Sequence, residues 1–153
     1  MESSTLRHNG PDDGRPASAS VRVPVRPDGV VRARAAVARA AMDAHLPPDR
    51  VDDLVIAVSE AVTNAMESQL RIGVSSPIEV LCGREGGAFE VTVADRGEGF
   101  VPEELAVRPP LASPHHLDVE RGWGIQLMRA LVDEIVFDVT GPGTCVRLRM
   151  SLP

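Results

Sequence analysis

The sequence predicts an α+β fold, a two-layer α/β sandwich in which helices cover a mixed, mainly antiparallel sheet. Two observations predict it. Hydrophobic residues alternate along several short segments bounded by glycine or proline, as in strands, and longer segments repeat them at helical spacing. The resulting order is β-α-α-β-β-loop-α-β-β, which groups helices with a mainly antiparallel sheet. With 153 residues, the chain is long enough to bury a core as one domain.

The chain is predicted to begin with a disordered tail over residues 1–18, which are polar and rich in glycine, proline and serine. The folded domain is expected over residues 19–153. It begins with an edge strand, because SVRVPVRP alternates valines with polar residues and proline. Asp28 then precedes an alanine- and arginine-rich helix that ends near His45.

A second, longer helix is predicted from Asp49, which is expected to cap it. Its apolar residues follow helical spacing and form one stripe: Val51, Leu54, Val55, Val58, Val62, Ala65 and Met66. After Gly73 the segments PIEVLC and AFEVTVAD alternate as strands, and the glycine-rich turn GREGG joins them.

Residues 97–121 are predicted to form a long irregular segment that contains several prolines. A loop of this length inside a compact domain is usually functional or disordered. The amphipathic segment GIQLMRALVDE is predicted to be a helix, and IVFDV and TCVRLRM are predicted to be the last two strands.

Composition excludes several classes of function. The net charge is −6 and the aromatic residues are three phenylalanines and one tryptophan, so we expect neither a basic nucleic-acid surface nor a base-stacking platform. All 16 basic residues are arginine, which excludes a Walker A lysine, the usual protein-kinase lysine and Schiff-base chemistry. Cys82 and Cys145 fit neither a disulfide framework nor a zinc site, and no signal peptide or membrane span is visible. We therefore expect a cytoplasmic protein that binds neither nucleic acid nor membrane directly.

Glu60 and Asn64 form the first candidate group, in the segment SEAVTNAME of the long helix. They are four residues apart, so they share a helix face, which lies opposite the stripe of Val51, Val55 and Val58. A glutamate there is a candidate general base, and an asparagine oxygen is a candidate Mg²⁺ ligand. The alternative is an ordinary solvated face.

Asp95 is the second candidate, at the end of the strand FEVTVAD and before two glycines. It shares strand parity with Phe89, Val91 and Val93, so its carboxylate points to the apolar side and needs hydrogen-bond donors. An adenine amino group is one such donor, and glycines after the strand allow the backbone to pass close to a base. The alternative is an aspartate that ends a strand at a turn.

Gly122 and Gly124 form the third candidate group, expected just before the last helix. Free amides at a helix start favour phosphate, and glycines allow it to approach. Arg121 is a candidate source of additional positive charge. The alternative is that these are ordinary glycines at a helix start.

Together the three groups resemble the Bergerat ATP-binding fold of the GHKL superfamily, over about residues 20–150. The motifs EAVTNA, DRGEGF, RGWGIQLMRALVDE and GTCVRL most resemble the small anti-sigma-factor serine/threonine kinases of bacteria. The resemblance implies ATP and Mg²⁺ as cofactors, with Asn64 holding Mg²⁺ and Glu60 activating the attacking hydroxyl or water. It assigns the adenine amino group to Asp95, with Gly97 and Gly99 shaping the pocket. It also implies an ATP lid over about residues 100–121, phosphate contacts at Gly122 and Gly124, and support of adenine recognition by Thr144.

This resemblance implies an ATP-dependent serine/threonine protein kinase that sequesters a sigma factor, phosphorylates an anti-sigma-factor antagonist and forms a homodimer. An alternative is an ATP-binding regulatory module that sequesters a partner without phosphoryl transfer. It is favoured by the segment NAMESQ, since members of that family often carry a histidine or another basic residue shortly after the asparagine. The catalytic domain of a histidine kinase is disfavoured, because no helical hairpin with a phosphoacceptor histidine precedes residue 49.

Overall fold

The computed structural model of the protein describes residues 19–98, 116–139 and 142–153. The element order is β1 (Ala19–Val23), α1 (Pro27–Asp43), α2 (Pro48–Arg71), β2 (Ile78–Glu85), β3 (Ala88–Ala94), α4 (His116–Leu131), β4 (Glu134–Asp138) and β5 (Cys145–Ser151). The predicted tail over residues 1–18 lies outside the described residues, as does the predicted lid up to residue 115.

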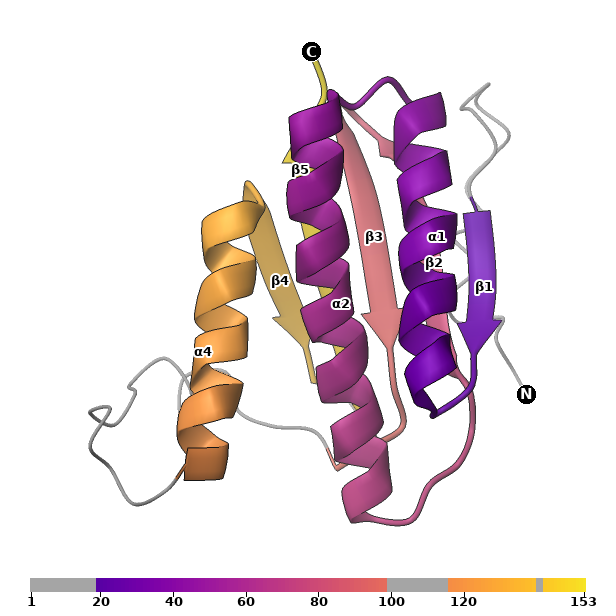
Figure 1. The fold of residues 1–153 in the computed structure, drawn as a ribbon, viewed down its shortest axis with the longest axis vertical. Helices are drawn as coiled ribbons and strands as arrows, with labels where there is room; N and C mark the ends of the chain where they lie inside the picture. Colours follow the sequence, from indigo (N-terminus) through magenta and orange to yellow (C-terminus); the bar gives the residue numbers. More distant parts are fainter. Residues whose placement is uncertain (1–18, 99–115, 140–141) are drawn as a thin grey trace.

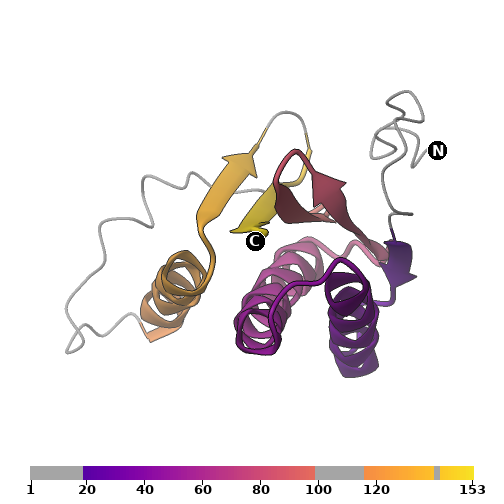
Figure 2. The ribbon, with the colours of Figure 1, turned by 90° about the horizontal axis from the view of Figure 1, so that it is seen from above.

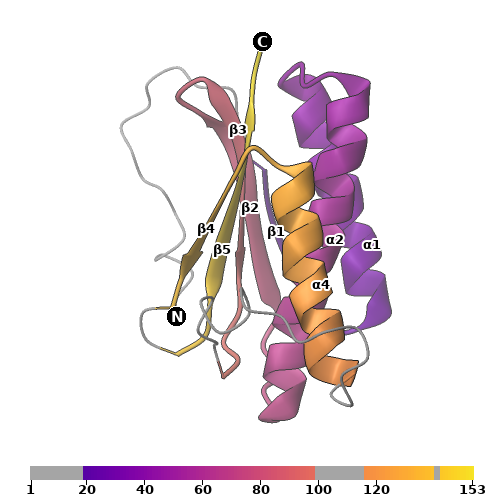
Figure 3. The ribbon, with the colours of Figure 1, turned by 90° about the vertical axis from the view of Figure 1, so that its left-hand side faces the viewer.

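The strands form one five-stranded sheet in the order β1-β2-β3-β5-β4. Helices α1, α2 and α4 all lie on one face of it, and α2 lies between the other two (Figures 1 and 2). Figure 3 views the same arrangement from the side and shows the two layers. The predicted two-layer sandwich is therefore confirmed. The sheet was expected to be mixed and mainly antiparallel, and every pairing among the described strands is antiparallel.

The core lies between the sheet and the helices, and the strand register builds it. Val80 of β2 lies opposite Val93 of β3, which in turn lies opposite Val146 of β5. The next such row crosses the same strands at Cys82, Val91 and Leu148, as the alternation of strand side chains requires. All of these residues are buried. The apolar stripe of α2 packs into the same core.

Both N-terminal helices begin at a proline, Pro27 in α1 and Pro48 in α2. The prediction that Asp49 caps α2 is wrong, because no side chain caps this helix and Asp49 lies in its first turn. Asp28 likewise lies within the first turn of α1 instead of preceding the helix. Proline suits the first helical position because the backbone N–H that it lacks would have no partner there. Acidic residues in the first turn interact favourably with the positive end of the helix dipole.

The hairpin and the last helix both differ from the prediction in their bounds. Strands β2 and β3 continue through most of the segment GREGG and leave only Gly86 and Gly87 in the turn. Helix α4 begins at His116 instead of Gly124, so the end of the predicted lid is helical. The predicted irregular segment is therefore shorter than expected at its C-terminal end.

Candidate functional site

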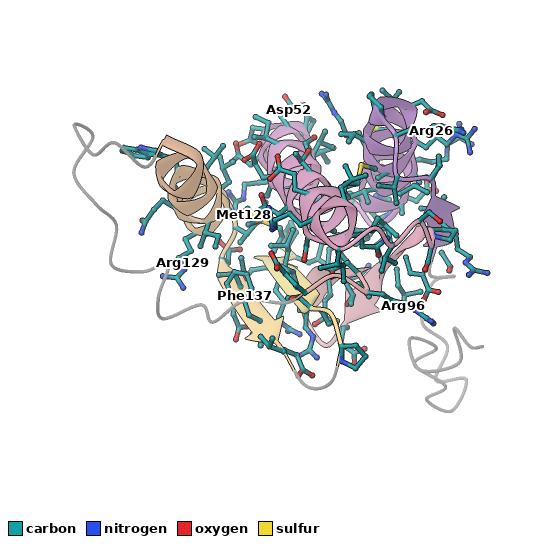
Figure 4. All side chains as sticks on the ribbon, turned by 90° about the horizontal axis from the view of Figure 1, so that it is seen from below. Arg26, Asp52, Arg96, Met128, Arg129 and Phe137 are labelled. Carbon is teal, nitrogen blue, oxygen red and sulfur yellow. The ribbon has the colours of Figure 1, made fainter. Side chains whose placement is uncertain are left out.

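A pocket lies between α2, α4 and the ends of β3 and β5. It is lined by Ala61, Asn64, Ala65, Ser68, Arg71, Val93, Asp95, Ile125, Met128, Phe137 and Val146. Figure 4 shows Met128 projecting from α4 toward α2. The cavity volume is about 10 Å³, roughly the space for one water molecule, so a larger ligand must displace side chains of the wall. A few polar groups in a mainly apolar wall are typical of a small-molecule site.

Asp95 follows β3 directly and lines this pocket. Its Oδ1 accepts hydrogen bonds from the backbone N–H of Gly97 at 2.8 Å and of Thr144 at 3.3 Å. Burial raises the pKa of the Asp95 carboxyl, and these two hydrogen bonds act in the opposite direction. Among the described residues none donates to Oδ2. This oxygen is therefore an available acceptor for a ligand N–H group.

The backbone next to Thr144 reaches Asp95 through a close approach at Gly143. Thr144 accepts a hydrogen bond at its carbonyl from the Asp95 N–H at 3.0 Å, which pairs the start of β5 with the loop after β3. Gly143 has φ of +91°, and a methyl group there would lie 2.0 Å from the Asp95 carbonyl oxygen. Only glycine fits this position.

Thr144 has a buried hydroxyl that is unpaired among the described residues. Thr144 is 4% exposed, and no described residue forms a hydrogen bond with its Oγ1. Buried polar atoms are rarely left unsatisfied, so a ligand or a water that bonds to this hydroxyl is expected. Together with the available Oδ2 of Asp95, this atom makes the described part of the site fit a polar heterocycle such as adenine.

Gly97 lies against α2. A methyl group at Gly97 would lie 2.1 Å from Ser68 Oγ, so the loop after β3 is in direct contact with the helix. The close contact with α2 therefore favours glycine at position 97, in addition to the predicted approach of the backbone to a base. Gly99, the other glycine predicted to shape the pocket, lies outside the described residues.

Glu60 and Asn64 are both half-buried and face α4. A methyl group at Gly124 would lie 2.7 Å from Glu60 Oε1 and 3.7 Å from Asn64 Nδ2. The two side chains thus converge on one point of α4, and their shared face is packed instead of freely solvated. Asn64 also lines the pocket that contains Asp95.

The predicted place of Gly122 and Gly124 is wrong. Both lie inside α4, where backbone N–H groups bond to carbonyls four residues earlier, so they offer no free amides of a helix start in this arrangement. Gly124 instead allows α4 to approach Glu60. Only the backbone of Arg121 and Gly122 is described.

Ser68, Gln69 and Arg71 are residues near the pocket that the sequence prediction missed. Gln69 is fully buried, and Arg71 forms an ion pair with Glu98 of the loop after β3. Helical spacing could have indicated Ser68, because it lies four residues after Asn64 and therefore on the same face of α2.

The remaining candidates for chemistry are not part of this site. Burial raises the pKa of the Cys82 thiol to about 11, so this cysteine is a packed and unreactive residue. Cys82 and Cys145 are both free. Within residues 19–98, 116–139 and 142–153, no three histidine, cysteine or acidic side chains are grouped as metal ligands. None of the described helices is long and apolar enough to cross a membrane.

Comparison with known proteins relates this site to a family. The sequence profile of the family described as "Histidine kinase-like ATPase domain" matches residues 23–150. The chain belongs to this family. Within it, the chain is 31% identical over 118 residues to the serine-protein kinase RsbW of Bacillus subtilis (strain 168), covering 75% of this chain and 74% of that protein. It is 34% identical over 115 residues to the anti-sigma F factor of Thermoanaerobacter sp. (strain X514), covering 71% of this chain and 77% of that protein.

Solved structures agree with this histidine kinase-like ATPase fold. The structure of the RsbU and RsbW domains of a Mycobacterium tuberculosis protein matches with a TM-score of 0.66 and 22% identity, covering 90% of this chain and 33% of that chain. The SiaB–SiaC complex of Pseudomonas aeruginosa matches with a TM-score of 0.61 and 13% identity, covering 86% of this chain and 88% of that chain. At these identities the likeness concerns the fold.

Proposed function

We propose that this chain is an ATP-dependent serine/threonine protein kinase of the anti-sigma-factor type. The observation that carries the proposal is the arrangement of Glu60 and Asn64 on α2, around Gly124, next to a pocket that ends at Asp95. A relative named serine-protein kinase supports the kinase activity, and a relative named anti-sigma factor supports the binding of a sigma factor. The protein sequesters a sigma factor, and it phosphorylates a serine or threonine of an antagonist of anti-sigma factors.

The adenine end of ATP binds at Asp95. The adenine amino group donates to Oδ2, while Oδ1 stays bonded to the two backbone amides that hold the carboxylate. Thr144, whose backbone N–H bonds to this carboxylate, supplies a second polar contact through its hydroxyl, which is unpaired among the described residues. Gly97 and Gly99 form the adjoining wall. The lid over residues 100–121, with Arg121, contacts the phosphates, whereas Gly122 and Gly124 lie inside α4 and offer no free amides to them.

Asn64 holds Mg²⁺ through its side-chain oxygen. Mg²⁺ usually keeps few protein ligands and takes the rest from phosphates and water, which suits a site with a single amide oxygen. When bound, the ion neutralises charge that develops on the phosphates during transfer.

Glu60 takes the proton of the attacking hydroxyl. The hydroxyl oxygen forms a bond to the γ-phosphorus, the bond from this phosphorus to the bridging oxygen breaks, and ADP leaves with the electron pair. Phosphoryl transfer asks little covalent work of a protein, so the position of the carboxylate is its main contribution.

The test separates binding from transfer. Glu60→Gln keeps the shape of the side chain but cannot accept the proton, so transfer of the γ-phosphate to antagonist proteins of the same organism should stop while ATP binding persists. Glu67→Gln, an exposed change on the same helix, is the matched control and should retain both. Loss of binding and transfer together in Glu60→Gln would contradict the role of Glu60.

A second candidate is a regulatory module that sequesters its partner without phosphoryl transfer. The favouring observation is that the positions after Asn64 carry Glu67, Ser68 and Gln69, and that Arg71 at the pocket is paired with Glu98. Stoichiometric capture of a partner by the wild type, with no phosphate on it after incubation with Mg²⁺ and ATP, would favour this candidate. The homodimer, the cytoplasmic location and the division into a tail and one domain stay predictions.

A further inference from the structure

Gln69 is a fully buried amide near the end of α2, and the proposed chemistry gives it no role. Its Oε1 accepts a hydrogen bond from the backbone N–H of Arg96 at 2.8 Å. Its Nε2 donates to the carbonyl of Ser76 at 2.7 Å and, at 3.4 Å, to that of Val74. A buried amide is tolerated when its donors and acceptor are matched, and here the partners come from two separate loops. The side chain thus joins α2, the loop before β2 and the loop after β3.

The loop after β3 is hydrogen-bonded to two neighbouring residues of α2, Ser68 and Gln69. Arg96, which Figure 4 labels, directly follows Asp95, and the next residue, Gly97, donates to Asp95 Oδ1. Beyond them the backbone N–H of Glu98 donates to Ser68 Oγ at 3.1 Å. Neighbouring residues of α2 thus hold the backbone on the C-terminal side of Asp95.

Helix α2 therefore connects the two ends of the proposed nucleotide site. Asn64 precedes Gln69 by five residues, which corresponds to a rise of about 7.5 Å along the helix. A loop bonded to Gln69 keeps the Asp95 carboxylate at a set distance from the Asn64 amide.

We propose that Gln69 is a positioning residue for the nucleotide, which fixes the loop after β3 on α2 so that Asp95 Oδ2 faces the adenine amino group. The inference rests on the proposed function and extends it to a residue that touches no substrate. It also gives a role to the end of the segment NAMESQ, in which Ser68 and Gln69 follow Asn64. In this chain these positions hold the adenine-binding loop.

The test compares ATP with inosine triphosphate, which carries an oxygen in place of the adenine amino group. We expect the wild type to bind ATP about tenfold to a hundredfold more tightly, since ITP lacks the hydrogen bond to the carboxylate. In Gln69→Leu, which has no amide to bond Arg96, we expect this preference to fall below about threefold while ITP affinity changes little. If that variant does not fold, Ser68→Ala removes one anchor and should lower the preference in the same direction.

Leu54→Ala is the matched control, because Leu54 is buried on the same helix about 22 Å before Gln69. It should destabilise the protein and keep the preference for ATP. An unchanged preference in Gln69→Leu, or an equal loss in Leu54→Ala, overturns the proposal.

Amide hydrogen exchange gives a readout that needs no nucleotide. The Arg96 amide should exchange slowly in the wild type and at least about tenfold faster in Gln69→Leu, because it loses its acceptor. A wild type that binds neither nucleotide contradicts the proposed function. The anchoring is then decided by exchange alone, and unchanged exchange at Arg96 overturns it.

Discussion

Asp95 combines two roles that looked like alternatives in the sequence. One carboxylate oxygen accepts two backbone amides and ends β3 at a turn, and the other accepts none from the described residues. The structural interpretation and the ligand-binding interpretation of this aspartate are therefore compatible, because each uses a different oxygen. The cost is a partly buried charge at neutral pH.

That cost predicts the effect of Asp95→Asn on the protein without nucleotide. Burial raises the pKa of Asp95 in the folded state, so the ionised carboxylate opposes folding above that pKa and is neutral in both states below about pH 4. The variant should unfold at the same temperature as the wild type, or a higher one, at pH 7, and this advantage should disappear as the pH falls below about 4. Thermal unfolding at several pH values measures it.

Asp52→Asn is the control for this comparison, since Asp52 is exposed on α2 and remote from the pocket. A variant Asp95→Asn that is less stable than wild type at pH 7 but matches it at low pH would contradict the account. It would mean that the charge of Asp95 stabilises the fold.

At the scale of elements, α2 and α4 meet at Gly124. Gly124→Ala places a methyl group 2.7 Å from Glu60 Oε1, closer than van der Waals contact, so the end of this flexible side chain must shift. Alanine favours the helix by roughly 1 kcal/mol, which offsets part of the crowding, and we expect little change in stability. We expect phosphoryl transfer to fall at least about tenfold, because a displaced base is poorly aligned.

The control for Gly124→Ala is Gly87→Ala, at a hairpin position where an added methyl group has no neighbour within 4 Å. It should leave transfer and stability close to the wild type. Transfer measured with the same ATP and antagonist protein separates the two variants. Equal activity in Gly124→Ala and wild type would show that Glu60 does not depend on this contact.

Asp133 joins three elements at the other end of the sheet. Its carboxylate accepts the backbone N–H of Ser151 at 2.7 Å and pairs with Arg50 at 2.8 Å, and these contacts lower its pKa. Stability from this group is present above the unfolded pKa near 4 and is lost as the pH falls through the lower folded pKa.

Asp133→Asn should therefore reduce stability at pH 7 by less than about 1 kcal/mol, because the pair is partly exposed and solvent weakens it. The difference should shrink toward pH 2, as the wild-type carboxylate becomes protonated in the folded state. Urea unfolding at both pH values measures it. An equal loss at both values would assign the effect to packing instead of charge.

Periodicity predicted the elements well where one face is buried. The stripe on α2 and the alternation on β2, β3 and β5 follow directly from a core between two layers. It failed at the start of α4, because RGWG reads as a helix start while the structure continues the helix through both glycines. It also missed the aspartate positions at the starts of α1 and α2, since proline occupies the first helical position.

On the scale of the whole molecule, the site is assembled from segments far apart in the chain. Asn64 on α2, Asp95 after β3 and Thr144 before β5 come together through strand pairing and helix packing. Spacing within one segment predicted that Glu60 and Asn64 share a face. Only the resemblance to a family related them to Asp95 and Thr144, and nothing in the sequence indicated that Gln69 would join α2 to two loops.

The central claim is that this fold binds Mg²⁺-ATP with its adenine on Asp95. Calorimetric titration of ATP into the purified protein, with and without Mg²⁺ and beside Asp95→Asn, tests it most directly. We predict Mg²⁺-dependent binding to the wild type that weakens at least about tenfold in the variant, as expected for a hydrogen bond to a charged group. Equal affinity in the two proteins would contradict the adenine assignment, and a wild type that binds no ATP would contradict the proposed function itself.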